Sequence, residues 1–134
     1  APYAGVNAML ARLREAGLRM SIATSKPTLY AKRIACGFGF ADCFDHIVGS
    51  NLDGTRVDKG EVIQCAMGEY PDAAPDDFVM VGDRKHDMMG AARWDVPAIG
   101  VLYGYGSREE LEACRPAKLV ESVRELEDAL LHLR

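Results

Sequence analysis

Apolar residues recur along the chain in two patterns that alternate from one end to the other. Five segments space them three or four positions apart, as on one face of a helix, at residues 5–16, 27–38, 59–69, 86–94 and 122–133. Short apolar runs between them predict buried strands at residues 18–23, 44–48, 78–81, 98–101 and 119–120. Helices of 9 to 12 residues that alternate with strands indicate βαβ units, so we expect an α/β fold with a mainly parallel sheet.

Cap and turn residues support these boundaries. Gly17 ends the first helical pattern, and Pro27 suits the first turn of the second. Ser122 and Glu125 have the spacing of a capping box, which predicts the start of the last helix. Residues 49–58 are polar and rich in turn formers, so we expect a loop or hairpin there.

Length and composition fit a single domain, residues 1–134. Apolar residues make up 49% of the chain and charged residues 27%, as in ordinary soluble proteins. The net charge of −4 argues against a nucleic-acid polymer as partner, because such a surface needs clustered Lys and Arg. No apolar run approaches the roughly 20 residues of a membrane span, and no signal-peptide pattern is visible. We therefore expect a cytoplasmic protein that has no membrane contact.

Four cysteines are widely spaced and include no C-x-x-C pair. We expect reduced, mostly buried thiols and no zinc site. The chain starts at Ala1 and not at Met, which indicates that a segment has been removed from its front.

Two acidic residues follow the strand predicted at residues 78–81. Asp83 stands at its end and Asp87 comes four residues later, where a helix begins, so both can face one crevice. Ligands of parallel sheets bind beyond the carboxyl ends of the strands, and such a carboxylate pair suits Mg²⁺. The alternative is structural: Asp83 caps the helix and Asp87 is a solvated acid in its first turn.

Hydroxyl groups follow the strand predicted at residues 18–23. Thr24 and Ser25 precede a helix, and the hydroxyl of Thr24 with the free N–H groups of the next turn can form a phosphate seat. The alternative is that either residue simply caps that helix. Lys59 begins another helix, where a cation opposes the helix dipole, so it either neutralises a phosphate or carboxylates or is an ordinary solvated lysine.

The order of these signals resembles the haloacid-dehalogenase-like hydrolases over essentially all 134 residues. A hydroxyl after one strand, a lysine some 35 residues later and G-D-x-x-x-D after a further strand carry the resemblance. Residues 23–27, 81–87 and 100–107 look most like the phosphoglycolate-phosphatase and 5′-nucleotidase branch. The resemblance implies a three-layer α/β/α Rossmann-like core and a Mg²⁺-dependent phosphate-monoester hydrolase.

The same resemblance implies a role for each candidate residue. Thr24 would hydrogen-bond the transferring phosphoryl group, with the backbone amide of Ser25 nearby. Lys59 would stabilise negative charge on that group and on the attacking carboxylate. Asp83 would hold Mg²⁺, and Asp87 would support it. These are the electrostatic contacts on which phosphoryl transfer depends.

The family's nucleophile motif, D-x-D-G-T, is not recognisable in this sequence. Residues 53–55 read D-G-T, but Asn51 stands where the attacking Asp would be, and an amide cannot form an acyl-phosphate. The resemblance places the nucleophile strand centrally, between the strands at 18–23 and 78–81, with a helical cap after it. Both are absent, so we expect the chain alone to be inactive. A lost N-terminal portion, a separate chain or a dimer of this chain would have to fill the gap.

Alternatives remain open at this point. A non-catalytic phosphate-binding or interaction module is the second hypothesis, and a phosphomutase or dehalogenase is a third. We expect a small phosphorylated metabolite as ligand, but the cap that sets specificity is missing, so phosphoglycolate and nucleoside 5′-monophosphates are both candidates. We expect Arg84, Tyr103 and Tyr105 to border the pocket for the leaving group. The alternative for the two tyrosines is that they pack at a loop.

Overall fold

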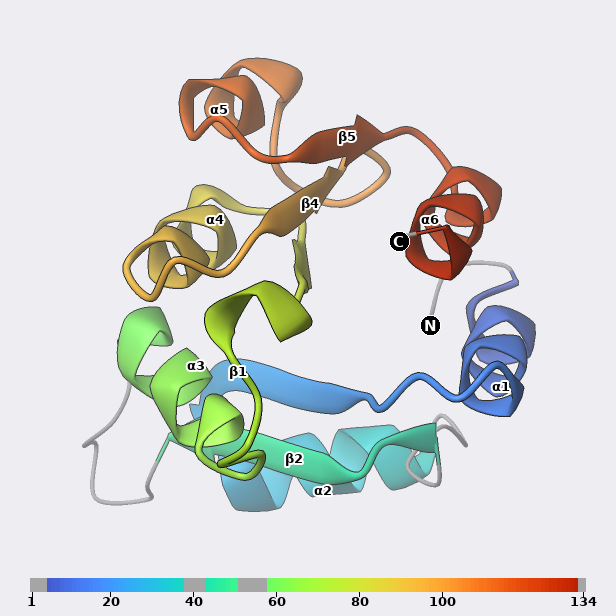
Figure 1. Ribbon diagram of the computed structural model, residues 1–134, viewed down its shortest axis with the longest axis vertical. Helices are drawn as coiled ribbons and strands as arrows, with labels where there is room; N and C mark the ends of the chain where they lie inside the picture. Colours follow the sequence, from blue (N-terminus) through green and yellow to red (C-terminus); the bar gives the residue numbers. More distant parts are fainter. Residues whose placement is uncertain (1–4, 38–42, 51–57, 133–134) are drawn as a thin grey trace.

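The computed structural model describes residues 5–37, 43–50 and 58–132 (Figure 1). Helices and strands alternate along the chain, which confirms the α/β fold. Their order is α1 (Val6–Glu15), β1 (Ser21–Pro27), α2 (Thr28–Gly37), β2 (His46–Ser50), α3 (Lys59–Met67), the 3₁₀ turn η2 (Pro75–Asp77), β3 (Met80–Gly82), α4 (Lys85–Ala92), β4 (Ala98–Val101), α5 (Arg108–Ala113), β5 (Lys118–Val120) and α6 (Val123–Leu131).

All strand pairs are parallel, but they form two sheets. β1 pairs with β2, and β4 lies between β3 and β5. Within the described residues, no ladder joins β1 to β3. The break therefore falls between the two strands where the resemblance places a central nucleophile strand.

Side chains of β4 explain the layered architecture. Ile99 and Val101 join the apolar cluster formed with α1 and α6, whereas Ala98 joins the cluster formed with α3, α4 and α5. Successive residues of a strand point to opposite faces, so β4 is covered on both sides. Figure 1 shows α1 beside α6, and α3 beside α4, in agreement with their contacts. This is the expected three-layer arrangement.

The helical patterns predicted the core of α1 correctly. Met9, Leu10 and Leu13 are buried there, and Val6 packs against the same cluster. Ser122 caps α6 as expected, because its Oγ accepts the N–H of Glu125 at 3.1 Å. The side chain of Glu125, however, accepts from the N–H of Glu121 and not from that of Ser122, so the reciprocal half of the capping box is displaced by one residue.

The end of β1 differs from its prediction. The strand continues through Thr24 to Pro27 instead of ending at Ala23. Between Ala23 and Pro27 it advances four positions, while β2 advances only two, from Val48 to Ser50. The hydroxyl segment therefore lies within an irregular stretch of β1 and not after the strand.

One helix was missed, and one other expectation was wrong. Residues 108–113 form α5, which the apolar pattern had not indicated. The cysteines are free but none is buried: Cys36 is exposed and the other three are intermediate. Cys36 is five positions from Ala31, a buried residue of α2, and thus about 140° around the helix from it.

Some expectations lie outside the described residues. They include the 51–55 segment with its D-G-T triplet and most of the expected loop at 49–58. Within the described part of the chain, none of the helices has the length and apolar character needed to cross a membrane.

Candidate functional site

The carboxylate of Asp87 is the best-held polar group near the carboxyl ends of the strands. Asp87 lies in the first turn of α4 and is only 8% exposed. Its Oδ2 accepts the N–H groups of Asp83 at 3.2 Å and Arg84 at 3.3 Å, and its Oδ1 accepts from Nζ of Lys59 at 2.8 Å. It therefore caps the start of α4, but it is not the solvated acid of the structural alternative.

Gly82 allows this carboxylate to reach the backbone. A Cβ at that position would overlap Cβ and Oδ2 of Asp87. The side chain of Asp87 thus lies directly over the last residue of β3. Any larger residue at position 82 would displace it.

Lys59 connects the two sheets at the site. It is the first residue of α3, which Asp58 caps by accepting the N–H of Glu61. Its Nζ donates to the carbonyl oxygen of Ala23 in β1 at 2.7 Å and to Oδ1 of Asp87 at 2.8 Å. Only 16% of the side chain is exposed, so Lys59 is not a solvated surface lysine. The structure therefore brings Lys59 and Asp87 together.

Asp83 is held by the loop that follows β4. Its Oδ2 accepts the backbone N–H of Tyr105 at 2.8 Å. A Cβ at Gly104 would overlap the side chain of Asp83, and one at Gly106 would overlap its carbonyl oxygen. The loop can approach this closely only because both residues are glycine.

Thr24 stands beside this cluster, and among the described residues its hydroxyl bonds within its own segment. Oγ1 of Thr24 accepts the N–H of Lys26 at 3.2 Å, a local turn within β1, and α2 begins only at Thr28. Thr24 therefore does not cap α2. Its neighbour Ala23 is the residue whose carbonyl binds Lys59, which places Thr24 next to the cluster along the chain. The side chain of Ser25 lies outside what the structure describes.

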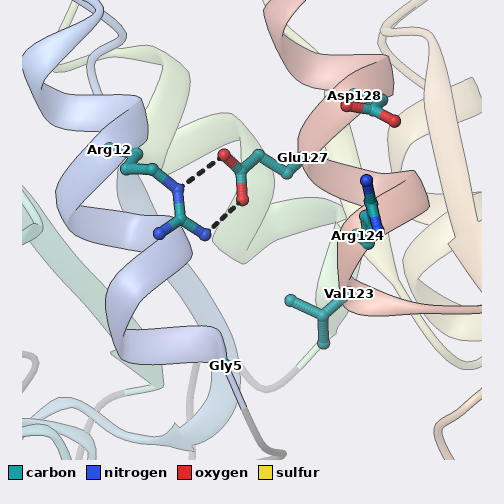
Figure 2. Close-up of a pocket in the computed structure, with 6 residues that line it drawn as sticks. All are labelled: Gly5, Arg12, Val123, Arg124, Glu127 and Asp128. Carbon is teal, nitrogen blue, oxygen red and sulfur yellow. Dashed lines mark hydrogen bonds and ion pairs between the residues drawn. The ribbon is translucent and has the colours of Figure 1, made fainter.

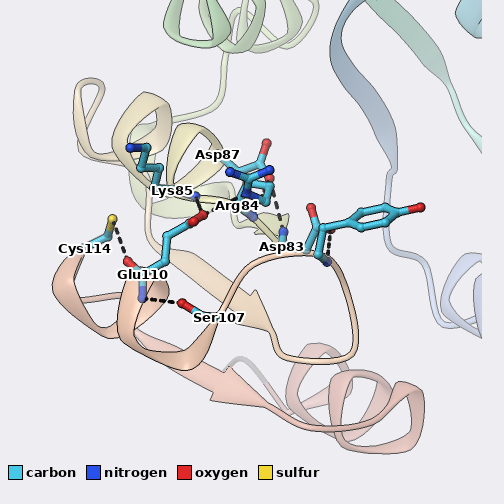
Figure 3. A network of polar contacts seen from close by, with 8 residues as sticks. Asp83, Arg84, Lys85, Asp87, Ser107, Glu110 and Cys114 are labelled. Atoms are coloured by element: carbon cyan, nitrogen blue, oxygen red, sulfur yellow. Dashed lines mark hydrogen bonds and ion pairs between the residues drawn. The ribbon is translucent and has the colours of Figure 1, made fainter.

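Glu110 is a member of the site region that the sequence did not indicate. Its Oε2 accepts from Nε of Arg84 at 2.9 Å and from the N–H of Lys85 at 2.8 Å (Figure 3). The pKa of Glu110 is lowered, first by the hydrogen bond from Arg84 and then by that from Lys85. Ser107 caps α5 through the N–H of Glu110, so the S-x-x-E spacing of Ser107 and Glu110 was the signal that could have revealed both the helix and this residue.

The two loop tyrosines behave differently. Tyr103 packs against the apolar cluster of α1 and α6, as the packing alternative expected. Tyr105 is 88% exposed, so its ring does not pack in the core although its backbone binds Asp83. Arg84, the third residue expected at a leaving-group pocket, pairs with Glu110 instead.

The carboxylates at the end of β3 fit a magnesium ion chemically. Mg²⁺ needs only one or two protein carboxylates because it keeps several waters. Among the described residues, Oδ1 of Asp83 has no hydrogen-bond partner, so this residue can bind a cation directly. Both oxygens of Asp87 already accept bonds, which suits a supporting role. In the same part of the chain, no group of three or more His, Cys, Asp or Glu side chains could hold a metal alone.

A shallow depression between α1 and α6 offers no comparable chemistry. There the guanidinium of Arg12 donates to both oxygens of Glu127, each at 2.7 Å (Figure 2). The charges at its centre are therefore mutually satisfied. It is lined by Gly5, Arg12, Val123, Arg124, Glu127 and Asp128.

A protein family matches most of the chain. Residues 1–101 match the family described as haloacid dehalogenase-like hydrolase. The chain belongs to this family, and the resemblance stated from its motifs is confirmed.

Named relatives cover almost the whole chain. A 5′-nucleotidase of Pseudomonas aeruginosa is 39% identical over 128 residues, 96% of this chain and 58% of that protein. Tyrosine-protein kinase PtkA of Mycobacterium tuberculosis is 35% identical over 96% of this chain and 44% of its own length. A phosphoglycolate phosphatase of Colwellia psychrerythraea is 27% identical over 92% of this chain and 54% of its own. The chain thus spans about half the length of the curated relatives it matches.

Solved structures also match nearly the whole chain over about 60% of their own length. The crystal structure of a predicted phosphatase from Clostridium acetobutylicum superposes with a TM-score of 0.91 at 44% identity. The match covers 96% of this chain and 59% of that one. The fold is therefore that of the core of this phosphatase.

Proposed function

We propose that the chain carries the metal and phosphate half of a Mg²⁺-dependent phosphomonoesterase site. The observation that supports this most strongly is the contact of Lys59 with both Ala23 and Asp87. Through it, one largely buried ammonium group joins β1 to the first turn of α4, which follows β3, and substrates of this fold class bind beyond the ends of such strands. A lysine that served only solubility would not be held in this way between a strand and a helix.

Each residue has a part in this proposal. Asp83 holds the cation, and Asp87 fixes the backbone of Asp83 while it keeps Lys59 in place. Lys59 and Thr24 bind the phosphoryl oxygens, together with the backbone N–H of Ser25. Mg²⁺, when bound, adds positive charge that offsets the charge of the phosphoryl group. The side chains thus position the phosphate and lower the cost of bringing its charge to the site.

The proposed site is incomplete in this chain. An attacking carboxylate on a strand between β1 and β3 would complete it, and the chain alone would then turn over no substrate. The proposed substrate is a small phosphate monoester in the cytoplasm, and the names of the relatives favour a nucleoside 5′-monophosphate or phosphoglycolate. A segment preceding residue 1, or a second polypeptide, would supply the carboxylate.

Magnesium binding tests the proposed site without requiring turnover. In a titration of the chain with MgCl₂ followed by NMR, the amide signals of residues 83–87 and of Tyr105 should move in a saturable way. Asp83→Asn should abolish that response, and Asp72→Asn, at an exposed acid in a turn, should not. Saturable binding that survives Asp83→Asn would contradict the proposed site.

A turnover assay tests the proposed inactivity. The chain should release no p-nitrophenol from p-nitrophenyl phosphate above the buffer rate, with Mg²⁺ present. Turnover that Asp83→Asn abolishes would show that the chain is active alone. That result would refute the proposed need for a further carboxylate while it supported the metal site.

A further inference from the structure

Arg84 is the cation nearest in sequence to the proposed metal-binding carboxylates. It directly follows Asp83, and its own N–H donates to Asp87. Its side chain is 44% exposed and could therefore turn in several directions. Within the described residues, the hydrogen-bond partner of its guanidinium is Glu110, at 2.9 Å.

Glu110 is fixed from two sides. The oxygen that accepts from Arg84 also accepts the N–H of Lys85, the first residue of α4. The backbone N–H of Glu110 is held by Ser107, which starts α5 (Figure 3). The carboxylate therefore has a set position. The guanidinium that it binds is close enough to Asp83 and Asp87 to feel their charge, but among the described residues its hydrogen bond goes to Glu110.

A free guanidinium next to Asp83 would compete with a divalent cation in two ways. It could pair with the carboxylate of Asp83, and its charge would repel the metal. Exposed cationic side chains change ion-pair partners at little cost in free energy. A carboxylate fixed in position would therefore be needed to keep the guanidinium of Arg84 from Asp83.

We propose that Glu110 is a positioning residue that holds the guanidinium of Arg84 away from Asp83 and so keeps this carboxylate available for a divalent cation. The inference rests on the proposed magnesium site. It adds a residue outside the motifs that define that site, and it assigns to α5 a part in metal affinity. The competing account is that Glu110 only ties α5 to the start of α4 through the N–H of Lys85.

Magnesium affinity of paired variants separates the two accounts. Glu110→Gln frees Arg84, so the Kd for Mg²⁺ measured by calorimetry should rise about two- to fivefold. Glu109→Gln removes the same charge from an exposed neighbour in the same turn and should leave the Kd within about 1.5-fold of the wild type. The double variant Arg84→Gln/Glu110→Gln should return to the wild-type affinity, because the competing cation is gone.

Two results would overturn the inference. A double variant that binds as weakly as Glu110→Gln would show that the tie to α4 is what matters. An equal loss in Glu109→Gln would show that only net charge matters. Melting curves of all variants, with affinities measured well below the lowest Tm, exclude unfolding as the cause.

A second readout does not need the metal. The amide of Tyr105 donates to Asp83, so its NMR shift in Mg²⁺-free protein reports on that carboxylate. It should move in Glu110→Gln and return in the double variant. If the wild type binds no Mg²⁺, the proposed function fails, but this signal still decides the inference. An unmoved Tyr105 amide in Glu110→Gln overturns the proposed pairing of the freed Arg84 with Asp83, and a shift that the double variant reverses upholds it.

Discussion

Replacing Asp87 by Asn changes one oxygen to an NH₂ group and nothing in shape. All three partners of the Asp87 carboxylate are donors: Nζ of Lys59 and the N–H groups of Asp83 and Arg84. An amide nitrogen can accept from none of them. In its better orientation, Asn keeps its oxygen on the two N–H groups and turns its NH₂ towards the ammonium of Lys59.

The cost of this change follows from burial. A hydrogen bond to a charged group contributes about 1.5–3 kcal/mol, and loss of one buried partner leaves the other unpaired. The side chains of Lys59 and Asp87 are 16% and 12% exposed, so hydrogen bonds to water offset part of the lost interaction energy. We expect Asp87→Asn to lower the free energy of unfolding by about 2 kcal/mol. For 134 residues, an unfolding entropy of about 2.1 cal/mol/K per residue makes this a fall in Tm of about 7 °C.

The assay is thermal unfolding followed by circular dichroism at pH 7, with Asp72→Asn as the control. Asp72 is exposed, and its carboxylate makes no ion pair among the described residues. The Tm of Asp72→Asn should therefore differ from that of the wild type by less than about 2 °C. If Asp87→Asn melted within the same margin, the carboxylate would not be holding Lys59 and the start of α4. The reasoning about the site would then be wrong.

Three further predictions concern packing, pH and capping. Gly82→Ala forces a Cβ into the side chain of Asp87 and should destabilise the fold by about 1–3 kcal/mol in urea unfolding. The pKa of Glu127 is lowered from its usual 4.5, chiefly by the hydrogen bond from Arg12, so this ion pair stabilises the fold above about pH 4.5 and ceases to do so as pH falls through the lowered pKa. The difference in urea midpoint between wild type and Glu127→Gln should therefore be constant from about pH 7 to 5 and shrink as pH falls further, through the lowered pKa. Ser107→Ala removes the cap of α5 and should cost about 1 kcal/mol, seen as a fall in Tm of about 3–4 °C.

Neighbouring positions supply controls for these variants. Gly68 has φ of −62°, an ordinary helical value, so Gly68→Ala should change stability much less than Gly82→Ala. Asp128 follows Glu127 in α6 and is exposed, so Asp128→Asn should show no such loss of effect in acid. Equal destabilisation by both glycine variants would contradict the close approach at Gly82. An effect of Glu127→Gln that stayed the same at every pH down to that of acid unfolding would contradict the ion pair.

Local patterns predicted those features that depend on neighbours in sequence. The spacing of Met9, Leu10 and Leu13 was enough for the buried face of α1, since a helix repeats every 3.6 residues. The four-residue separation of Asp83 and Asp87 was enough to bring both to the start of α4. These features needed no knowledge of the rest of the chain.

The missed features depend on tertiary contacts. Helix α5 has six residues and only Leu111 is buried, so no apolar pattern could mark it. The irregular end of β1 follows from its register with β2, which the sequence of one strand does not contain. The contact of Glu110 with Arg84 joins residues 26 positions apart and appears only once β4 brings the following loop back over Asp83.

In the proposed function, Lys59, Asp83 and Asp87 form one site that takes Mg²⁺ and a phosphate together. Two ligands of one site must change each other's affinity by the same factor. Calorimetric titration of the chain with inorganic phosphate should therefore give a Kd at least about fivefold lower in saturating MgCl₂ than in EDTA. That gain should disappear in Asp83→Asn. Equal phosphate affinity with and without Mg²⁺, or a gain that survives Asp83→Asn, would contradict the account.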